Sequence, residues 1–152
     1  MDTAAFLKEN REAIVNEAEA SLEARHVRHY EVVRGEELRE RLDRLFDRLL
    51  EAVEHRDLAP LLRYTHDLAE ERFKDGYGLS EVQAAFNVLE EAAWRRVFAA
   101  LDPSEFAETL GLVSSALGAA KDDLGRTYVS LATDTHAPSL NVRQLFAGSE
   151  GT

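Results

Sequence analysis

Apolar residues recur along most of the chain at helical spacing. The clearest case is the segment 36–55, where one series of residues is spaced by three or four positions: Leu38, Leu42, Leu45, Leu49 and Val53. This spacing puts the series on one face of a helix, and Phe46 and Leu50 widen that face. No stretch alternates apolar and polar residues as a half-buried strand does. The pattern therefore predicts a helix over 36–55 and no strands.

Four further helices are predicted on the same grounds, and their approximate ranges are 3–30, 57–75, 79–101 and 103–133. Asp57 is suited to cap the helix over 57–75, and Gly76 and Gly78 are suited to end it. Ser80, together with Gln83, is expected to cap the next helix one turn after Gly78. The run 102–105, Asp-Pro-Ser-Glu, combines a capping residue, a proline at the first helical position and an acid at the third.

The apolar stripes of these helices give the expected core. In the helix over 3–30 the stripe is Leu7, Ile14, Ala18 and Leu22. In the helix over 57–75 it is Leu58, Leu61, Leu62, Thr65, Leu68 and Phe73. In the helix over 79–101 it is Val82, Phe86, Leu89, Ala93 and Val97, broadened by Trp94, Phe98 and Leu101. In the last helix it is Phe106, Leu110, Val113, Leu117, Ala120, Leu124 and Leu131, and this helix is the best candidate for a bundle core or a dimer seam.

Short connections between sequential helices favour antiparallel packing. We therefore predict an all-α, up-and-down bundle of about five helices, with the helix over 3–30 lying across the others; a globin-like variant stays open. Residues 1–133 form one domain in this interpretation. Residues 134–152 form a mobile tail, in which the segment 139–146 is predicted to make a short helix that docks through Leu145 and Phe146.

Charge and composition narrow the functions. The 152 residues include 18 Lys and Arg against 29 Asp and Glu, a net charge of −11, which disfavours binding to nucleic acid or to anionic lipid. There is no cysteine, which excludes disulfides, thiol catalysis and thiolate zinc sites and suits a cytoplasmic location. No apolar run approaches the roughly 20 residues that span a bilayer. We expect a cytoplasmic protein that binds neither nucleic acid nor membrane.

Histidine offers two alternatives. His66 precedes Asp67 and Leu68, an order similar to the phosphoacceptor box of sensor kinases, so a histidine phosphotransfer protein is one alternative. Glu23, His26 and His29 are three residues apart and share a helical face, so a metal-binding four-helix bundle is the other. A globin-like haem site would need a histidine well past the middle of the chain, and none occurs between His66 and His136. No cofactor is expected.

Aromatic residues suggest a ligand cavity as a further hypothesis. The candidates are Trp94, Tyr64, Phe86 and Phe98, with Arg95 to bind an acidic group. Aromatic residues at helical spacing are more often simply core, and Arg95 and Arg96 more often pair with Glu90, Glu91 or a neighbouring helix. No nucleophile elbow, P-loop or dinucleotide fingerprint is present, so we expect a protein that is not an enzyme.

One segment resembles a known family. Residues 68–97 read LAEERFKDGYGLSEVQAAFNVLEEAAWRRV, a small-residue and arginine helix, a glycine, and then a helix with aromatic and leucine residues at helical spacing. This pattern resembles the N-terminal domain of the RsbRD type of RsbT co-antagonist, and the similarity covers roughly residues 6–130. The family often has serine where this chain has Gly78.

The resemblance implies an all-helical regulatory domain. Such domains stand ahead of a STAS domain in stressosome proteins, and similar ones precede sensor kinases and PucR-type regulators. They are thought to sense or to scaffold, often as dimers, and have no established catalytic residues. We therefore expect a non-catalytic regulatory or sensory domain of bacterial stress response or transcription control. Its partner would be another protein or a second copy in a homodimer, with a small-molecule ligand left open, and the sequence fits a stand-alone regulator or part of a longer protein.

Overall fold

The computed structural model describes residues 2–25 and 35–136, and every regular element in these residues is a helix. Six helices follow one another: α1 (Thr3–Glu9), α2 (Arg11–Arg25), α3 (Gly35–His55), α4 (Ala59–Lys74), α5 (Leu79–Ala100) and α6 (Pro103–His136). The all-helical prediction is confirmed, while the number of helices within the described residues is six and not about five. α6 ends at His136, and the short helix predicted over 139–146 lies outside the described residues.

The additional helix arises at Asn10, because the predicted helix over 3–30 is interrupted there. Asp2 caps α1 by accepting a 2.8 Å hydrogen bond from the Ala5 amide. Asn10 ends it, since its side-chain amide donates to the Phe6 carbonyl at 2.9 Å. The Arg96 guanidinium then donates to the Asn10 side-chain oxygen at 2.8 Å, which holds this bend against α5. The asparagine side chain forms local hydrogen bonds that compete with those of the helical backbone.

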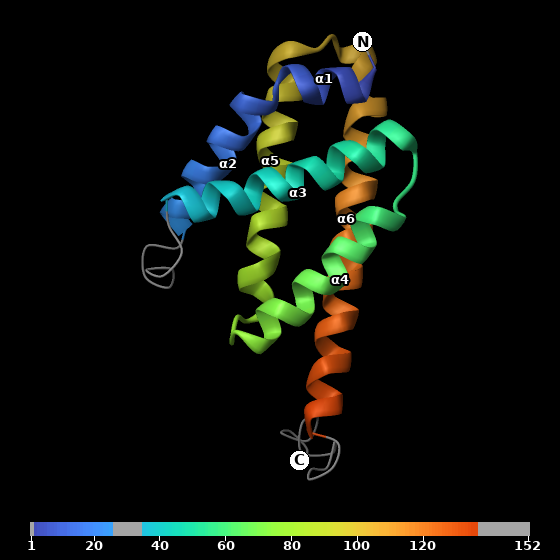
Figure 1. Cartoon of the computed structure of the whole chain (residues 1–152). Helices are drawn as coiled ribbons and strands as arrows, with labels where there is room; N and C mark the ends of the chain where they lie inside the picture. Colours follow the sequence, from blue (N-terminus) through green and yellow to red (C-terminus); the bar gives the residue numbers. More distant parts are fainter. Residues whose placement is uncertain (1, 26–34, 137–152) are drawn as a thin grey trace.

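The helices do not all run up and down. α5 and α6 form an antiparallel hairpin, α2 runs beside α5, α4 runs beside α6, and α3 crosses over the hairpin obliquely (Figure 1). α1 lies across the end of the bundle where α5 turns into α6 (Figure 1), and there the hydroxyls of Thr3 and Thr109 are 3.2 Å apart. In this position α3 contacts both members of the hairpin.

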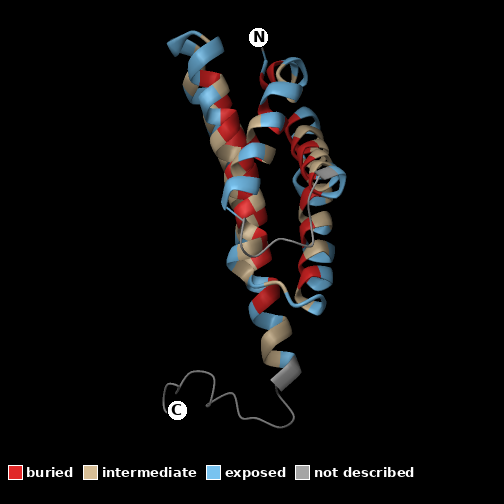
Figure 2. Cartoon of the chain, turned by 90° about the vertical axis from the view of Figure 1, so that its left-hand side faces the viewer, coloured by how far each residue is buried: buried red, intermediate tan, exposed pale blue. Residues whose placement is uncertain are grey.

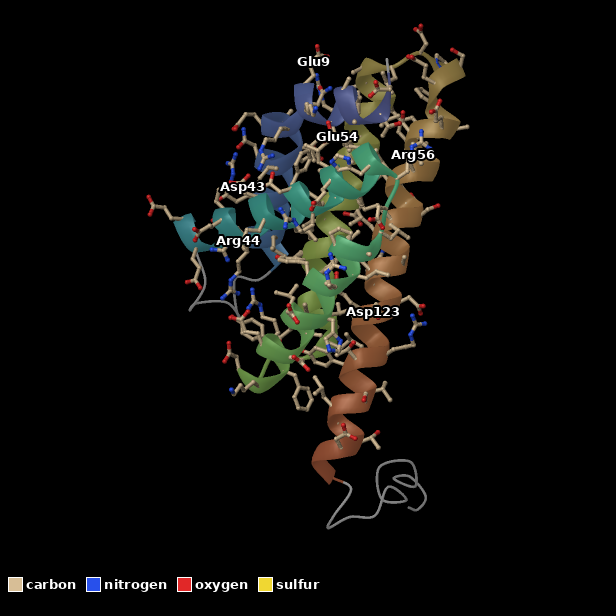
Figure 3. The ribbon with its side chains drawn as sticks, turned by 45° about the vertical axis from the view of Figure 1, so that its right-hand side comes forward. Glu9, Asp43, Arg44, Glu54, Arg56 and Asp123 are labelled. Atoms are coloured by element: carbon tan, nitrogen blue, oxygen red, sulfur yellow. The ribbon has the colours of Figure 1, made fainter. Side chains whose placement is uncertain are left out.

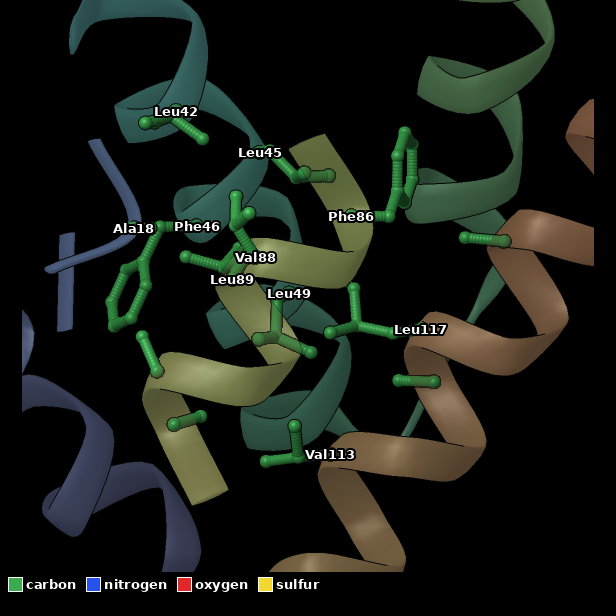
Figure 4. Close-up of a cluster of buried hydrophobic side chains, with 14 of the residues drawn as sticks. Ala18, Leu42, Leu45, Phe46, Leu49, Phe86, Val88, Leu89, Val113 and Leu117 are labelled. Carbon is green, nitrogen blue, oxygen red and sulfur yellow. The ribbon is translucent and has the colours of Figure 1, made fainter. Parts of the chain in front are cut away.

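The core lies between α3 and the hairpin. Leu42, Leu45, Phe46 and Leu49 of α3 are at most 2% exposed. They face Phe86 and Leu89 of α5 and Leu117 of α6 (Figure 4). Each large apolar side chain buried here contributes about 1.5–3 kcal/mol. The buried residues form continuous inner faces along the helices, with exposed residues on the outside (Figure 2), so the stripes predicted for 36–55 and 103–133 describe the core correctly over most of their length.

Three residues predicted to face inward are exposed. Leu58, in the turn before α4, is 39% exposed, and Trp94 and Phe98 on α5 are 40% and 57% exposed. Each residue turns a helix by about 100°, and this rotation places Trp94 and Phe98 beyond the edge of the buried face of α5.

Capping at the helix starts differs from the prediction. The Asp57 carboxylate accepts a hydrogen bond from the Ala59 amide at 3.1 Å, but the residue that directly precedes α4 is Leu58, so Asp57 does not occupy the capping position predicted for it. The cap predicted at Ser80 is wrong: α5 begins directly after Gly78, whose amide donates to the Glu81 carboxylate at 2.6 Å. Gly76 has φ +89°, a left-handed conformation that glycine adopts at low cost, and it ends the α4 segment.

Ion pairs cover the outer side of α3. Asp43, Arg44 and Glu54 project from it (Figure 3). Arg11 of α2 reaches Asp47 of α3 at 2.6 Å, and Arg39 of α3 reaches Glu12 of α2 at 3.0 Å. Exposed pairs of this kind contribute little individually, so they set the polar outer surface rather than the fold.

Candidate functional site

The five residues predicted to line a ligand cavity are distributed over different surroundings. Phe86 is fully buried in the core, whereas Trp94 and Phe98 lie exposed, one turn apart, on α5. Arg95 is paired with Glu17 of α2 and not with a ligand pocket, which agrees with the expected pairing to a neighbouring helix. The structure therefore brings together only Trp94 and Phe98 among these residues.

Tyr64, the fifth residue, is half-buried on α4 among arginines. Burial raises the pKa of the Tyr64 phenol, and the positive charges of Arg72, Arg44 and Arg48 act in the opposite direction. Nearby, the Tyr77 ring lies 5.8 Å from the guanidinium carbons of both Arg41 and Arg72. These arginines also have carboxylate partners on their own helices, including Glu37 for Arg41 at 2.8 Å, so this cluster is balanced in charge and serves α3–α4 packing.

His66, the alternative phosphoacceptor, is accessible. Its side chain is 52% exposed on α4. Its Nδ1 lies 3.3 Å from the Thr127 hydroxyl of α6, and its Nε2 lies 3.4 Å from the Glu70 carboxylate. Both ring nitrogens thus have polar neighbours, an arrangement that orients the ring.

The metal alternative falls partly outside the structure. Glu23 is exposed on α2, while His26 and His29 are outside the described residues. Within residues 2–25 and 35–136, no three His, Asp or Glu side chains come together in a way that could hold a metal ion.

A different surface stands out, which we call the outer face of the hairpin. It consists of the sides of α5 and α6 turned away from the core: Gln83, Asn87, Trp94 and Phe98 of α5, and Gly111, Ser114, Gly118, Gly125 and Val129 of α6. Val129 is 62% exposed, the largest value among the exposed large apolar residues. The outer face therefore shows exposed apolar side chains at both of its ends.

Hydrogen bonds fix the two helices across this face. The Trp94 indole N–H donates to the Ser114 hydroxyl at 3.1 Å, which holds the ring over α6. Lys121 Nζ donates to Asn87 and to Glu90, both at 3.0 Å. At the end of the hairpin the rings of Phe98 and Phe106 meet edge to face at 5.0 Å, so the exposed aromatic side chains are held in defined positions.

A groove opens at the other end of the outer face. It is lined by the start of α5 and the second half of α6, with Leu79, Gln83, Gly125 and Val129 among its residues. Gly125 has no side chain to fill it, and this is one reason that the groove exists.

Comparison with known protein families matches residues 8–143 to the RsbT co-antagonist protein RsbRD N-terminal domain. The chain belongs to this family. RsbRD N-terminal domains are regulatory domains of stress signalling. Neither a curated protein nor a solved structure matches the chain significantly.

In this RsbRD-type domain, the segment that carried the resemblance is mainly structural. Val82, Phe86 and Leu89 are buried core residues, and Gly76 and Gly78 form the turn between α4 and α5. In this chain these residues therefore maintain the packing of α5 and the turn before it.

The sequence-based interpretation overlooked the outer face. The available signal was the spacing of Gly111, Gly118 and Gly125, each seven residues after the last, in a segment otherwise rich in helix formers. In the part of the chain that the structure describes, no helix combines the length and apolarity needed to cross a membrane.

Proposed function

We propose that this RsbRD-type domain regulates a bacterial stress pathway without catalysis, by protein–protein contact through the outer face of the hairpin. The observation that carries the proposal is the exposure of Trp94 and Phe98 on one face of α5. Exposed aromatics that are held in place are typical of the energetically dominant residues of protein interfaces.

The family description supports the choice of pathway. The family is named after the N-terminal domain of the RsbT co-antagonist protein RsbRD, which supports a pathway controlled by an RsbT-type protein. Small-ligand sensing is supported less, because the residues suggested for a cavity are divided between the core and the exposed face.

The experiment is a reporter of the stress pathway in the bacterium of origin. A Trp94→Ser, Phe98→Ser double variant is expected to lose regulation while its level in the cell and its helix content by circular dichroism stay near those of the unaltered protein. Leu58→Ser is the matched control, because Leu58 is 39% exposed, close to the 40% of Trp94, but lies in the turn before α4. Full regulation by the double variant would contradict the proposal.

Native mass spectrometry addresses the sensing alternative. Protein purified without an affinity metal is expected to show only the mass of the chain or of its multiples. A reproducible additional mass would identify a retained ligand and favour sensing instead.

A further inference from the structure

We propose that the groove between the start of α5 and the second half of α6 is a docking site for the segment 139–146 of the same chain. Residues 137–152 lie outside the described residues, and the groove opens close to the point where they follow α6. The inference goes beyond the proposed function, which rests on the aromatic end of the hairpin, and it is tested separately from it.

The groove is suited to apolar side chains. Leu79 of α5 and Val129 of α6 line it, and Gly125 leaves space between them, since a Cβ atom there would meet nothing within 4 Å. Val129 is 62% exposed, and it is the one large apolar side chain of α6 that is exposed within the described residues. An occupant that covers Val129 would therefore remove apolar surface from water.

The charged groups beside the groove are already engaged within the domain. Lys121 donates to Asn87 and to Glu90, both at 3.0 Å. Arg126 is paired with Asp122 of its own helix. A segment that offers apolar side chains therefore fits the groove better than one that needs an ion pair with it.

The segment 139–146 offers such side chains. Val142, Leu145 and Phe146 are related as i, i+3 and i+4, so they share one face of the helix predicted there. Leu140, two positions before Val142, lies about 200° away from it around the helix. Amphipathic helices bind apolar grooves through residues with this spacing. The family match also continues past α6 to residue 143 and so includes the first part of the segment.

The connection to α6 favours a return along the same helix. α6 ends at His136, and Ala137 and Pro138 separate it from the predicted helix. Proline has no amide hydrogen to donate, which disfavours continuation of α6 through this point. Two residues are enough to connect a pair of antiparallel helices. α6 extends past the turn between α4 and α5 (Figure 1), so a returning helix meets the end of α6 first and the groove next.

The equal rise of the two helices determines which residues meet. Each helix advances 1.5 Å per residue, so equal counts from the turn put Leu145 level with Ser130 and Phe146 level with Val129. Both of these α6 residues line the groove. Because the connection is short, the effective concentration of the segment at the groove is in the millimolar range, and a weak contact is sufficient.

Charge agrees with this register. Arg143 is the one charged residue of the segment, and the same count puts it level with Ala132. Asp134 is exposed and lies two residues further along α6, an offset of about 3 Å that an arginine side chain can span. The chain carries a net charge of −11, so a basic residue in the segment is attracted to the domain as a whole.

Backbone NMR on the full chain is the primary test. The heteronuclear NOE values of residues 142–146 are expected to match those of α6. A Leu145→Ser, Phe146→Ser double variant is expected to lower them and to shift the amide signals of Leu79 and Val129. Leu140→Ser is the matched control, because it removes a leucine from the opposite face of the same segment and should leave both readouts unchanged.

Trypsin cleavage after Arg143 tests the groove with the segment left unaltered. Gly125→Gln fills the groove, so it is expected to speed this cleavage at least about fivefold, since proteolysis follows the population of the open form. Glutamine is a better helix former than glycine, so helix content by circular dichroism should hold, which separates a blocked groove from a damaged fold. Gly118→Gln, on the same helix but outside the groove, is the matched control and should leave the cleavage rate unchanged.

Three results would overturn the proposal. They are low NOE values for residues 142–146 in the unaltered chain, a cleavage rate that Gly125→Gln does not change, and shifts at Leu79 that grow with protein concentration. The last result would assign the groove to the segment of a second copy. None of them bears on the proposed function, which the Trp94→Ser, Phe98→Ser variant tests at the other end of the hairpin.

Discussion

The inner face of α6 carries Val113, Leu117, Ala120 and Leu124, each at most 1% exposed. The outer face of the same helix carries three glycines with open space around them. On the inner face every group has neighbours, so a substitution there is a change in packing. At these three glycines, no other part of the described chain lies within 4 Å of the position that a Cβ atom would occupy. The comparison separates residues that maintain the fold from residues that are available for contact with something else.

Among substitutions that test this difference between the two faces, Leu117→Glu is expected to have the largest effect on stability. It places a carboxylate among apolar side chains with no partner, which should cost about 3–5 kcal/mol, a large part of the stability of an ordinary domain. Urea unfolding followed by circular dichroism measures the change. Ser115→Glu, two residues away and exposed, should stay within about 0.5 kcal/mol of the unaltered chain. Equal effects of the two substitutions would contradict the assignment of faces.

Tyr128→Phe is expected to have a smaller effect on the inner face. The Tyr128 hydroxyl donates to the Tyr77 carbonyl at 2.8 Å and ties α6 to the turn before α5. Its loss should reduce the free energy of unfolding by about 0.5–1.5 kcal/mol. Val129→Ala, at the adjacent exposed position, is the control in the same unfolding measurement. A stability unchanged in Tyr128→Phe would show that this hydrogen bond is dispensable.

Gly118→Ala should have the opposite sign. A Cβ there meets nothing, so the monomer should gain about 0.5–1 kcal/mol from better helix propensity. Unfolding is best measured at concentrations where the chain is monomeric. Gly76→Ala is the contrasting variant, because its φ of +89° penalises any side chain, and it should lose stability. Destabilisation of the monomer by Gly118→Ala would mean that the outer face is not open.

The smallest expected effect is alkaline destabilisation. Burial raises the pKa of Tyr128 and of Tyr64 above their ordinary value of 10.0. Their protons are therefore held more tightly in the folded state, so stability is complete below about pH 10 and falls as pH rises through the raised values. Urea unfolding between about pH 9 and pH 11 should show this decline, and Tyr128→Phe should show less of it. A decline of the same size in that variant would assign the effect to other groups.

The sequence predicted the inner faces better than the outer ones. In α3 and α6 the apolar spacing identifies Leu42, Leu49 and Leu117 as core, because burial of such residues follows directly from helix periodicity. The exposure of Trp94 and Phe98 could not be read in this way, since periodicity does not reveal how wide a buried face is. That width depends on which neighbours pack against α5.

Two other features could not be predicted from local sequence patterns. The break at Asn10 depends partly on its bond to Arg96, 86 residues away, and no local pattern contains that contact. The candidate site was missed for a different reason. The spacing of Gly111, Gly118 and Gly125 is visible in the sequence, but only the structure shows that space remains beside each of them.

The contact between Thr3 and Thr109 has a consequence for assembly, because the two residues are 106 positions apart in the chain. At synthesis rates of about 5–20 residues per second, Thr109 is added roughly 5–20 s after Thr3. α1 has only 7 residues, and isolated helices shorter than about 12 residues are marginal in water. α1 therefore gains its contact with α6 only after α6 has begun to be made, so its final docking comes late in folding although it leads in synthesis.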